Sequence, residues 1–156
     1  MNGLKIEKLK EWNEEILERL VQIYMQGYDG LREYGGEGVG YARRYLSWYL
    51  KKMRDGFFVA KIGDNIVGFA VCARDWYHKF LGERVGYIGE LVVDKEYQGH
   101  HVGGALMEAC LDYLKGCKKI ALEVGVKNEN AIRFYERWGF KKVGTEGKWV
   151  VMVREV

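Results

Sequence analysis

A glycine-rich turn lies between a β-rich run and an amphipathic helix in the segment LVVDKEYQGHHVGGALMEACL, residues 91–111. This order constrains the fold more than any other feature of the chain. A strand that leads through such a turn into a helix gathers free backbone N–H groups at the positive end of the helix dipole. The segment therefore predicts a mixed α/β structure in which the turn either reverses the chain or binds a phosphate.

The turn matches neither of two common phosphate motifs. No Gly-Lys-Ser/Thr follows it, which excludes a P-loop, and the spacing GxGxxG of a dinucleotide fingerprint is absent. Taken alone, the turn is compatible with simple chain reversal. A ligand site needs a second signal.

That second signal lies about 30 residues further on, in VKNENAIRFYERWGF at residues 126–140. Asn128, Ala131, Tyr135 and Gly139-Phe140 follow the spacing N-x-x-A-x-x-x-Y-x-x-x-G-F. Together the two segments resemble the GNAT acetyltransferase superfamily, whose acetyl-CoA motif Gln/Arg-x-x-Gly-x-Gly/Ala is matched from Gln98 to Gly103. The resemblance covers about residues 57–144 by motif and the whole chain by the order of its elements.

The resemblance implies an acetyl-CoA site along these segments. Backbone N–H groups of His101, Gly103 and Gly104 would hold the pyrophosphate. Leu91 and Val93 would pair with the pantetheine arm as an added strand does, and an N–H there would stabilise the oxyanion of the thioester. The other expected cofactor-binding residues are Gln98, Gly99, Val102, Asn128 and Tyr135.

His101 departs from the motif, because it stands where the family has its first glycine. Glycine there would allow a positive φ, and His is among the other residues that tolerate the left-handed region best. The histidine does not remove the backbone N–H donors of the turn, but it can change the affinity for the cofactor.

Two side chains are the expected catalytic groups. Tyr135 stands where the resemblance puts the general acid that protonates the departing thiolate, although its helical face also suits core packing. Glu90 is a carboxylate inside an apolar strand, and burial would raise its pKa toward that of a useful base. A solvent-facing Glu90 is the alternative, and Glu123 in the neighbouring predicted strand or a water molecule is the reserve base.

The alternation of strands and helices indicates one domain over residues 1–156 with a mixed α/β sheet. The resemblance implies a GNAT-like acyl-CoA N-acyltransferase fold, with a central, mostly antiparallel sheet flanked by helices. Asn13 is the expected cap of the first helix, and Gly139 the expected end of the last. The predicted strands are 3–8, 57–62, 66–73, 85–93, 119–126, 140–144 and 148–154. The predicted helices are 13–27, 42–53, one from the glycine turn to about 115, and 129–138.

Composition argues against several classes of partner and site. The formal net charge is only +3, with both signs interleaved, which does not favour a nucleic-acid partner. No apolar run suits a membrane span or signal peptide, so we expect a cytoplasmic protein. The few Gln and Asn beside many Lys and Glu lean toward a thermophile. Cys72, Cys110 and Cys117 have the character of core residues, and His78, His100 and His101 lack further metal ligands at suitable spacing.

We therefore expect an N-acetyltransferase that joins acetyl-CoA to a primary amine in a ternary complex. A small amine, a polyamine, a protein lysine and a protein N-terminus all remain open as acceptors, and a homodimer is consistent with the resemblance. A non-catalytic acyl-CoA-binding module is the first alternative, and a nucleotide-binding α/β protein the second.

The acceptor amine is expected to contact two loops, because carboxylates beside aromatic rings suit a cationic amine. The first loop runs from Tyr28 to Tyr41 and contains Asp29, Glu33, Tyr34 and Glu37. The second runs from Asp75 to Arg84 and contains His78.

Overall fold

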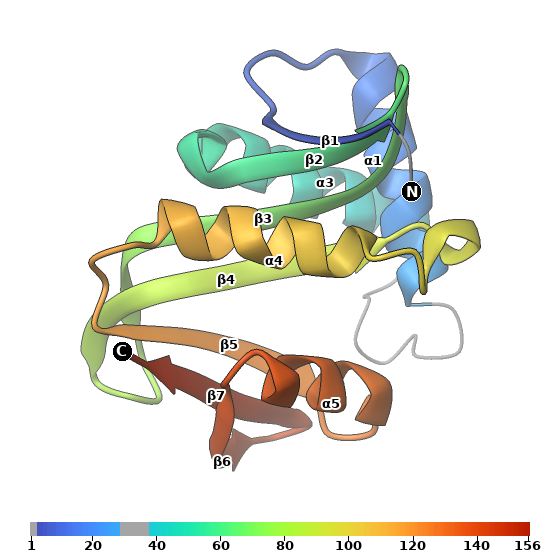
Figure 1. The fold of residues 1–156 in the computed structure, drawn as a ribbon. Coiled ribbons are helices and arrows are strands. Elements are labelled where there is room, and N and C mark those ends of the chain that lie inside the picture. The colour runs from blue at the N-terminus through green and yellow to red at the C-terminus, as the bar shows by residue number, and fades with distance from the viewer. Residues whose placement is uncertain (1–2, 29–37) are drawn as a thin grey trace.

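The computed structural model describes residues 3–28 and 38–156, and its elements follow the order that the sequence predicts (Figure 1). The strands are β1 (Leu4–Lys8), β2 (Phe57–Ile62), β3 (Asn65–His78), β4 (Glu83–Val93), β5 (Lys119–Gly125), β6 (Lys141–Glu146) and β7 (Trp149–Glu155). The helices are α1 (Glu14–Gly27), α3 (Gly38–Lys52), α4 (Val102–Tyr113) and α5 (Glu129–Arg137), with short 3-10 turns η1 (Arg54–Gly56) and η2 (Lys95–Tyr97).

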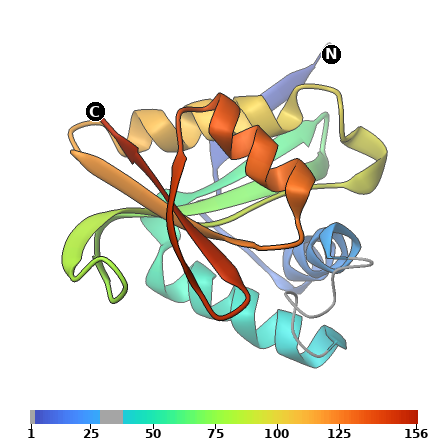
Figure 2. The same cartoon turned by 90° about the horizontal axis from the view of Figure 1, so that it is seen from below.

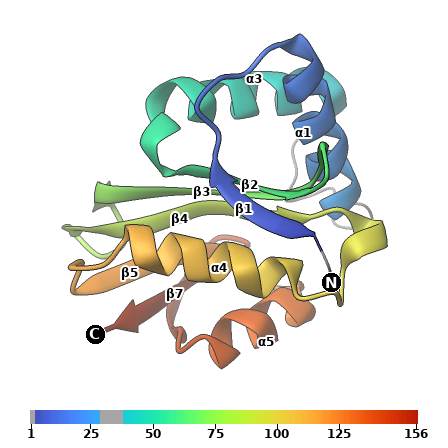
Figure 3. The ribbon, with the colours of Figure 1, turned by 45° about the horizontal axis from the view of Figure 1, so that its top comes forward.

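The strands form one sheet in the order β1-β2-β3-β4-β5-β7-β6. Every neighbouring pair is antiparallel except β4 and β5, which run parallel. Helices α1 and α3 cover one face of this sheet and α4 and α5 the other (Figures 2 and 3). The expectation of a mostly antiparallel sheet flanked by helices is confirmed.

Both faces of the sheet are buried, which explains the nearly continuous apolar runs of the central strands. Successive side chains of a strand point to opposite faces. Phe57 and Val59 accordingly join the core under α1 and α3, whereas Phe58 and Ala60 join the core under α4 and α5. Each catalytic candidate can therefore be assigned to one face.

The helix ends agree with the sequence signals. The N–H of Ile16 donates to Asn13 Oδ1 at 2.9 Å, which caps α1, and Gly139 follows α5 with φ 89°. Helix α3 begins at Gly38 instead of near residue 42, so Tyr41 belongs to a helix and not to the expected loop.

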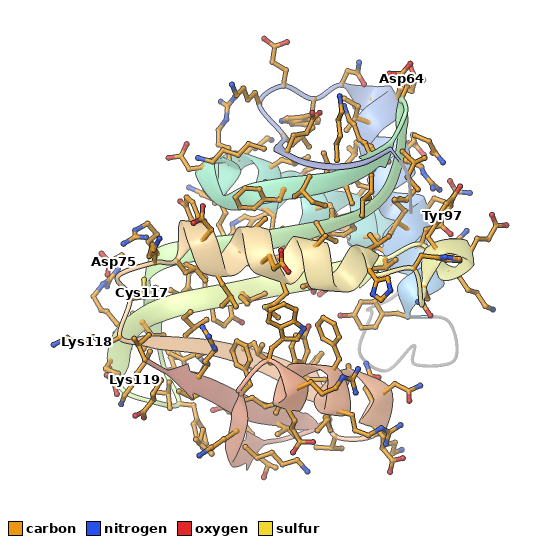
Figure 4. All side chains as sticks on the ribbon, viewed as in Figure 1. Asp64, Asp75, Tyr97, Cys117, Lys118 and Lys119 are labelled. Carbon is orange, nitrogen blue, oxygen red and sulfur yellow. The ribbon has the colours of Figure 1, made fainter. Side chains whose placement is uncertain are left out.

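The prediction of a loop from Asp75 to Arg84 is wrong. Strand β3 continues to His78 and β4 begins at Glu83, with Tyr77 paired to Arg84, so most of the segment is a hairpin. Aromatic stacking and charge pairing across the two strands explain the extension, because the Trp76 and Tyr87 rings stack 4.9 Å apart and Arg84 Nε lies 2.6 Å from Asp75 Oδ1. Asp75 lies with Lys119 at the end of the sheet opposite Tyr97 (Figure 4).

Candidate active site

Strands β4 and β5 diverge after a short contact. Only Gly86 with Ile120 and Tyr87 with Ala121 are paired, and beyond them the two strands separate toward α5 (Figure 1). A bulge at Gly89 accompanies the separation, since Glu90 pairs with Val71 and Ile88 with Cys72. The C-terminal half of β4 therefore has no paired strand on the side of β5, and we call this interruption of the strand pairing the opening.

Backbone groups of β4 face this opening. The N–H of Asp94 donates to Val67 O at 2.8 Å, toward β3. Because the direction of the backbone groups alternates along a strand, those of Leu91 and Val93 point away from β3, toward the opening. The side chain of Gln98 donates to Val93 O at 3.4 Å. Leu91 and Val93 thus have the orientation that strand-like pairing with a pantetheine arm requires.

The glycine-rich turn ends at the N-terminus of α4. The N–H of Ala105 donates to His101 O at 3.1 Å, the first bond of the helix. Val102, Gly103 and Gly104 precede it, so their N–H groups have no acceptor within the helix. No side chain caps this end. These donors, at the positive end of a helix dipole, form an anion site of the kind that the sequence predicts.

The start of the turn is fixed to α1. Asp94 Oδ1 accepts from the N–H of Glu96 at 2.9 Å, and Asp94 Oδ2 lies 2.5 Å from Arg19 Nη2. Arg19 Nε also donates to Ile66 O at 2.8 Å. Ion pair and hydrogen bonds thereby hold the end of β4 in place just before the turn.

His101 adopts the left-handed conformation, with φ 65° and ψ 11°, the only non-glycine residue with positive φ among residues 3–28 and 38–156. Gly99, in the same turn, has φ 83°. The motif position therefore needs a positive φ, and His101 supplies it while its side chain is exposed.

We expect His101→Gly to keep or raise stability by up to about 1 kcal/mol, because relief of the left-handed strain outweighs the added freedom of the unfolded chain. His100 does not have a positive φ, so the matched change His100→Gly should cost about 0.5–1 kcal/mol. Urea unfolding of the two variants measures the difference. Equal losses would contradict the conformational account of His101. CoA affinity of His101→Gly should stay within about tenfold.

The residues of the second motif lie on α5. Asn128 caps the helix by accepting from the N–H of Ala131 at 3.3 Å, which occupies its side-chain carbonyl and leaves its amide N–H groups as donors. Tyr135 is buried and packs 5.9 Å from Phe140, ring to ring. Among the described residues, no side chain or backbone group forms a hydrogen bond with the Tyr135 hydroxyl. The hydroxyl proton is therefore not committed to another acceptor.

Burial and the charge of Glu90 raise the pKa of Tyr135 above its ordinary value, so the phenol stays protonated at neutral pH. Tyr135 belongs to the core on the α4 and α5 face. Packing and the acid role are thus compatible: the ring is a core residue and the hydroxyl is a protonated donor.

Glu90 lies on the opposite face and is half-buried beneath α1 and α3. Tyr28 Oη donates to Oε1 at 3.0 Å and Tyr45 Oη donates to Oε2 at 2.7 Å. Burial raises the pKa of Glu90 to about 7, although both hydrogen bonds act to lower it. A carboxyl group with this pKa is divided between its two protonation states at neutral pH, as a general base should be.

Glu123 lies on the same face of the sheet, in β5. Tyr87 Oη donates to Oε1 at 2.5 Å, and His78 Nε2 lies 2.7 Å from Oε2. His78 Nδ1 accepts from the N–H of Leu81 at 3.3 Å, which leaves Nε2 to donate to Glu123. His78 is buried and ends strand β3, so it does not lie in a loop as the sequence predicted. Each oxygen of Glu123 already has a partner.

Most partners of the two carboxylates were not predicted from the sequence. Tyr45 and Tyr49 lie one helical turn apart on α3, and Tyr87 alternates with apolar residues in β4. The repeat of Tyr41, Tyr45 and Tyr49 at intervals of four was a usable signal, because it places three phenols on one helix face. In the other expected loop, Tyr28 contacts Glu90, whereas Asp29, Glu33, Tyr34 and Glu37 lie outside the described residues.

Residues 3–28 and 38–156 contain neither a metal-ligand cluster nor a membrane-spanning helix. No group of three or more His, Cys, Asp or Glu side chains there could hold a metal ion. No helix of those ranges is long and apolar enough to span a membrane. Cys72 and Cys110 are buried in the core and Cys117 is partly buried.

Known proteins resemble the chain along most of its length. Residues 10–140 match the family described as "Acetyltransferase (GNAT) family". The "Uncharacterized N-acetyltransferase MJ1207" of Methanocaldococcus jannaschii is 31% identical, over 99% of this chain and 70% of its own. "N-alpha-acetyltransferase 30" of Schizosaccharomyces pombe is 36% identical over 64% of this chain and 67% of its own. The crystal structure of PH1933 from Pyrococcus horikoshii OT3 superposes with a TM-score of 0.91 at 53% identity, covering 98% of both chains.

Proposed function

Because the chain belongs to the acetyltransferase (GNAT) family, we propose that it transfers the acetyl group of acetyl-CoA to the α-amino group of a polypeptide, by direct attack in a ternary complex. The observation that carries this proposal is the placement of Glu90 and Tyr135 on opposite faces of the sheet beside the opening between β4 and β5. Acetyl-CoA enters from the face of α4 and α5, and the amine from the face of α1 and α3.

The free N–H groups of Val102, Gly103 and Gly104 bind the pyrophosphate. The outward backbone groups of Leu91 and Val93 hold the pantetheine arm and place an N–H at the thioester carbonyl. The cofactor thereby continues the sheet where β5 leaves β4.

The reaction needs two proton transfers. The acceptor arrives as an ammonium ion, and the Glu90 carboxylate accepts one of its protons. The nitrogen then attacks the thioester carbon, a C–N bond forms and the C–S bond breaks. The nitrogen loses a second proton, and the departing sulfur gains one through the Tyr135 hydroxyl, so the products are the amide, CoA thiol and protonated Glu90.

The pKa of Glu90 favours an α-amine among the acceptors. A protein N-terminus has a pKa of about 8, only about one unit above that of Glu90, so the first transfer costs about 1 kcal/mol. A lysine ammonium, with a pKa of about 10.4, would cost about 5 kcal/mol. The similarity to a protein named for N-alpha-acetylation supports the same class.

Thiol release with acetyl-CoA and a peptide bearing a free N-terminus tests the proposal against a non-catalytic binding module. Saturating acetyl-CoA, at about 100 times its dissociation constant, should stabilise the fold by about 2.7 kcal/mol. The peptide should then release CoA, whereas the same peptide with a blocked N-terminus should not. Stabilisation without CoA release for any amine would leave a non-catalytic binding module. If acetyl-CoA neither stabilises the fold nor releases CoA, both the enzyme and the binding module are contradicted.

A further inference from the structure

A phenol from α3 contacts the carboxylate of the proposed base. Tyr45 Oη donates to Glu90 Oε2 at 2.7 Å, the shorter of the two hydrogen bonds to this side chain. We propose that Tyr45 is a positioning residue, which holds the Glu90 carboxylate in place and sets the pH range over which it accepts a proton. The inference rests on Glu90 acting as the base of the proposed function.

The direction of the hydrogen bonds follows from the protons that each group carries. Tyr45 has one hydroxyl proton, and an ionised carboxylate can only accept. Tyr45 therefore donates to Glu90, and Tyr49, whose hydroxyl lies 3.0 Å from that of Tyr45, must donate to Tyr45. The result is a chain from Tyr49 through Tyr45 to Glu90, in which each bond strengthens the next.

Packing holds the Tyr45 ring in position. Tyr41 stacks on it with centroids 5.8 Å apart, and Tyr24 and Tyr49 lie at 5.5 and 4.8 Å. Gly89 leaves room for the Tyr49 hydroxyl, because a Cβ at Gly89 would lie only 2.6 Å from that oxygen. The hydroxyl of Tyr45 is thus oriented before any acceptor binds.

No cation contacts Glu90 within the part of the chain that the structure describes, so neutral phenols alone stabilise its charge. Among the described residues, the titratable groups that interact with the charge of Glu90 are all tyrosines, and none of them is positively charged. These groups are Tyr24 and Tyr28 from α1, Tyr45 and Tyr49 from α3, Tyr87 in β4 and Tyr135 from α5.

Loss of the Tyr45 hydroxyl should therefore make Glu90 harder to ionise. Hydrogen bonds to charged groups are strong enough that Tyr45→Phe should raise the pKa of Glu90 by about 1 to 2 units. Because the base must be ionised, the acidic limb of kcat/KM should move to higher pH by the same amount. The rate above the new limb should stay within about tenfold of the wild-type rate, since the carboxylate is then a stronger base.

Two measurements test this expectation. The first is the pH profile of kcat/KM for Tyr45→Phe, with Tyr113→Phe as the matched control, since Tyr113 packs on the other face of the sheet. The second is a carbon NMR titration of the Glu90 carboxyl group without acceptor, assigned by its loss in Glu90→Gln. Tyr49→Phe, which removes only the donor to Tyr45, should shift the titration in the same direction by less.

A higher midpoint in Tyr45→Phe and an unchanged one in Tyr113→Phe would support the proposal. An unchanged Glu90 midpoint in Tyr45→Phe, or a rate loss equal at every pH, would overturn it and leave Tyr45 as packing. Should Tyr45→Phe fail to fold, an unchanged midpoint in Tyr49→Phe would overturn it as well. If the NMR midpoint moves but no acceptor is acetylated, the proposed function fails while the effect of Tyr45 on Glu90 stands.

Discussion

Glu90→Gln should lower the rate of acetyl transfer at neutral pH by about 10² to 10⁴, the usual range for loss of a general base. The amide keeps the size of the side chain and can still accept from Tyr45, but it cannot take a proton. The limb of kcat/KM near pH 7 that belongs to Glu90 should disappear. The remaining pH dependence should follow the protonation of the acceptor amine, and should move when an amine of different pKa is used.

Stability gives a second readout of the same change. The pKa of Glu90 is raised from about 4.5 when unfolded to about 7 in the folded protein, so the folded state binds the proton more tightly. This contribution to stability is complete below pH about 4.5 and is lost as pH rises toward about 7. Glu90→Gln should remove that part of the pH dependence.

Glu123→Gln is the matched control, because it makes the same chemical change on the same face of the sheet. It should reduce the rate less, since Glu123 contacts His78 and Tyr87 at the paired end of β4 and β5, whereas Glu90 directly precedes Leu91 in the unpaired half of β4. A larger loss in Glu123→Gln, with the limb retained in Glu90→Gln, would move the base role to Glu123.

Tyr135→Phe should reduce turnover by about 10² to 10⁴ while the affinity for CoA changes little. Phenylalanine preserves the packing of the ring against Phe140 and removes only the hydroxyl. Without that donor, the thiolate must leave unprotonated. Single-turnover rates and calorimetric binding of CoA separate the two effects.

Tyr113→Phe controls for the loss of a phenol from the same core, away from the opening. Wild-type turnover in Tyr135→Phe would make Tyr135 a packing residue only. A parallel loss of CoA affinity and turnover would instead assign it to cofactor binding.

The sequence predicted the features that depend on local order. The glycines of the turn, the Asn13 cap and the alternation of strands and helices all act over a few residues, and each appears as expected. The carboxylate in β4 was also predictable, because a charge in an apolar strand needs a reason.

The partners of the carboxylates could not be predicted in the same way. Tyr28 and Tyr45 lie 62 and 45 residues from Glu90 along the chain, so only the packing of α1 and α3 on the sheet brings them together. The extension of β3 to His78 depends likewise on pairing with β4. The polar run that ends β3 resembles a loop in composition because Arg74, Asp75 and Tyr77 are exposed, and only the pairing with β4 makes it a strand.

The measurement that tests the account most directly uses one peptide with a free N-terminus and one internal lysine. After incubation with acetyl-CoA, tandem mass spectrometry locates the added acetyl group. With a base whose pKa is about 7, we predict acetylation of the α-nitrogen and an unmodified lysine at neutral pH. Acetylation of the lysine while the N-terminus stays unmodified would contradict the proposed function. A peptide that stays unmodified although acetyl-CoA is bound would contradict it as well.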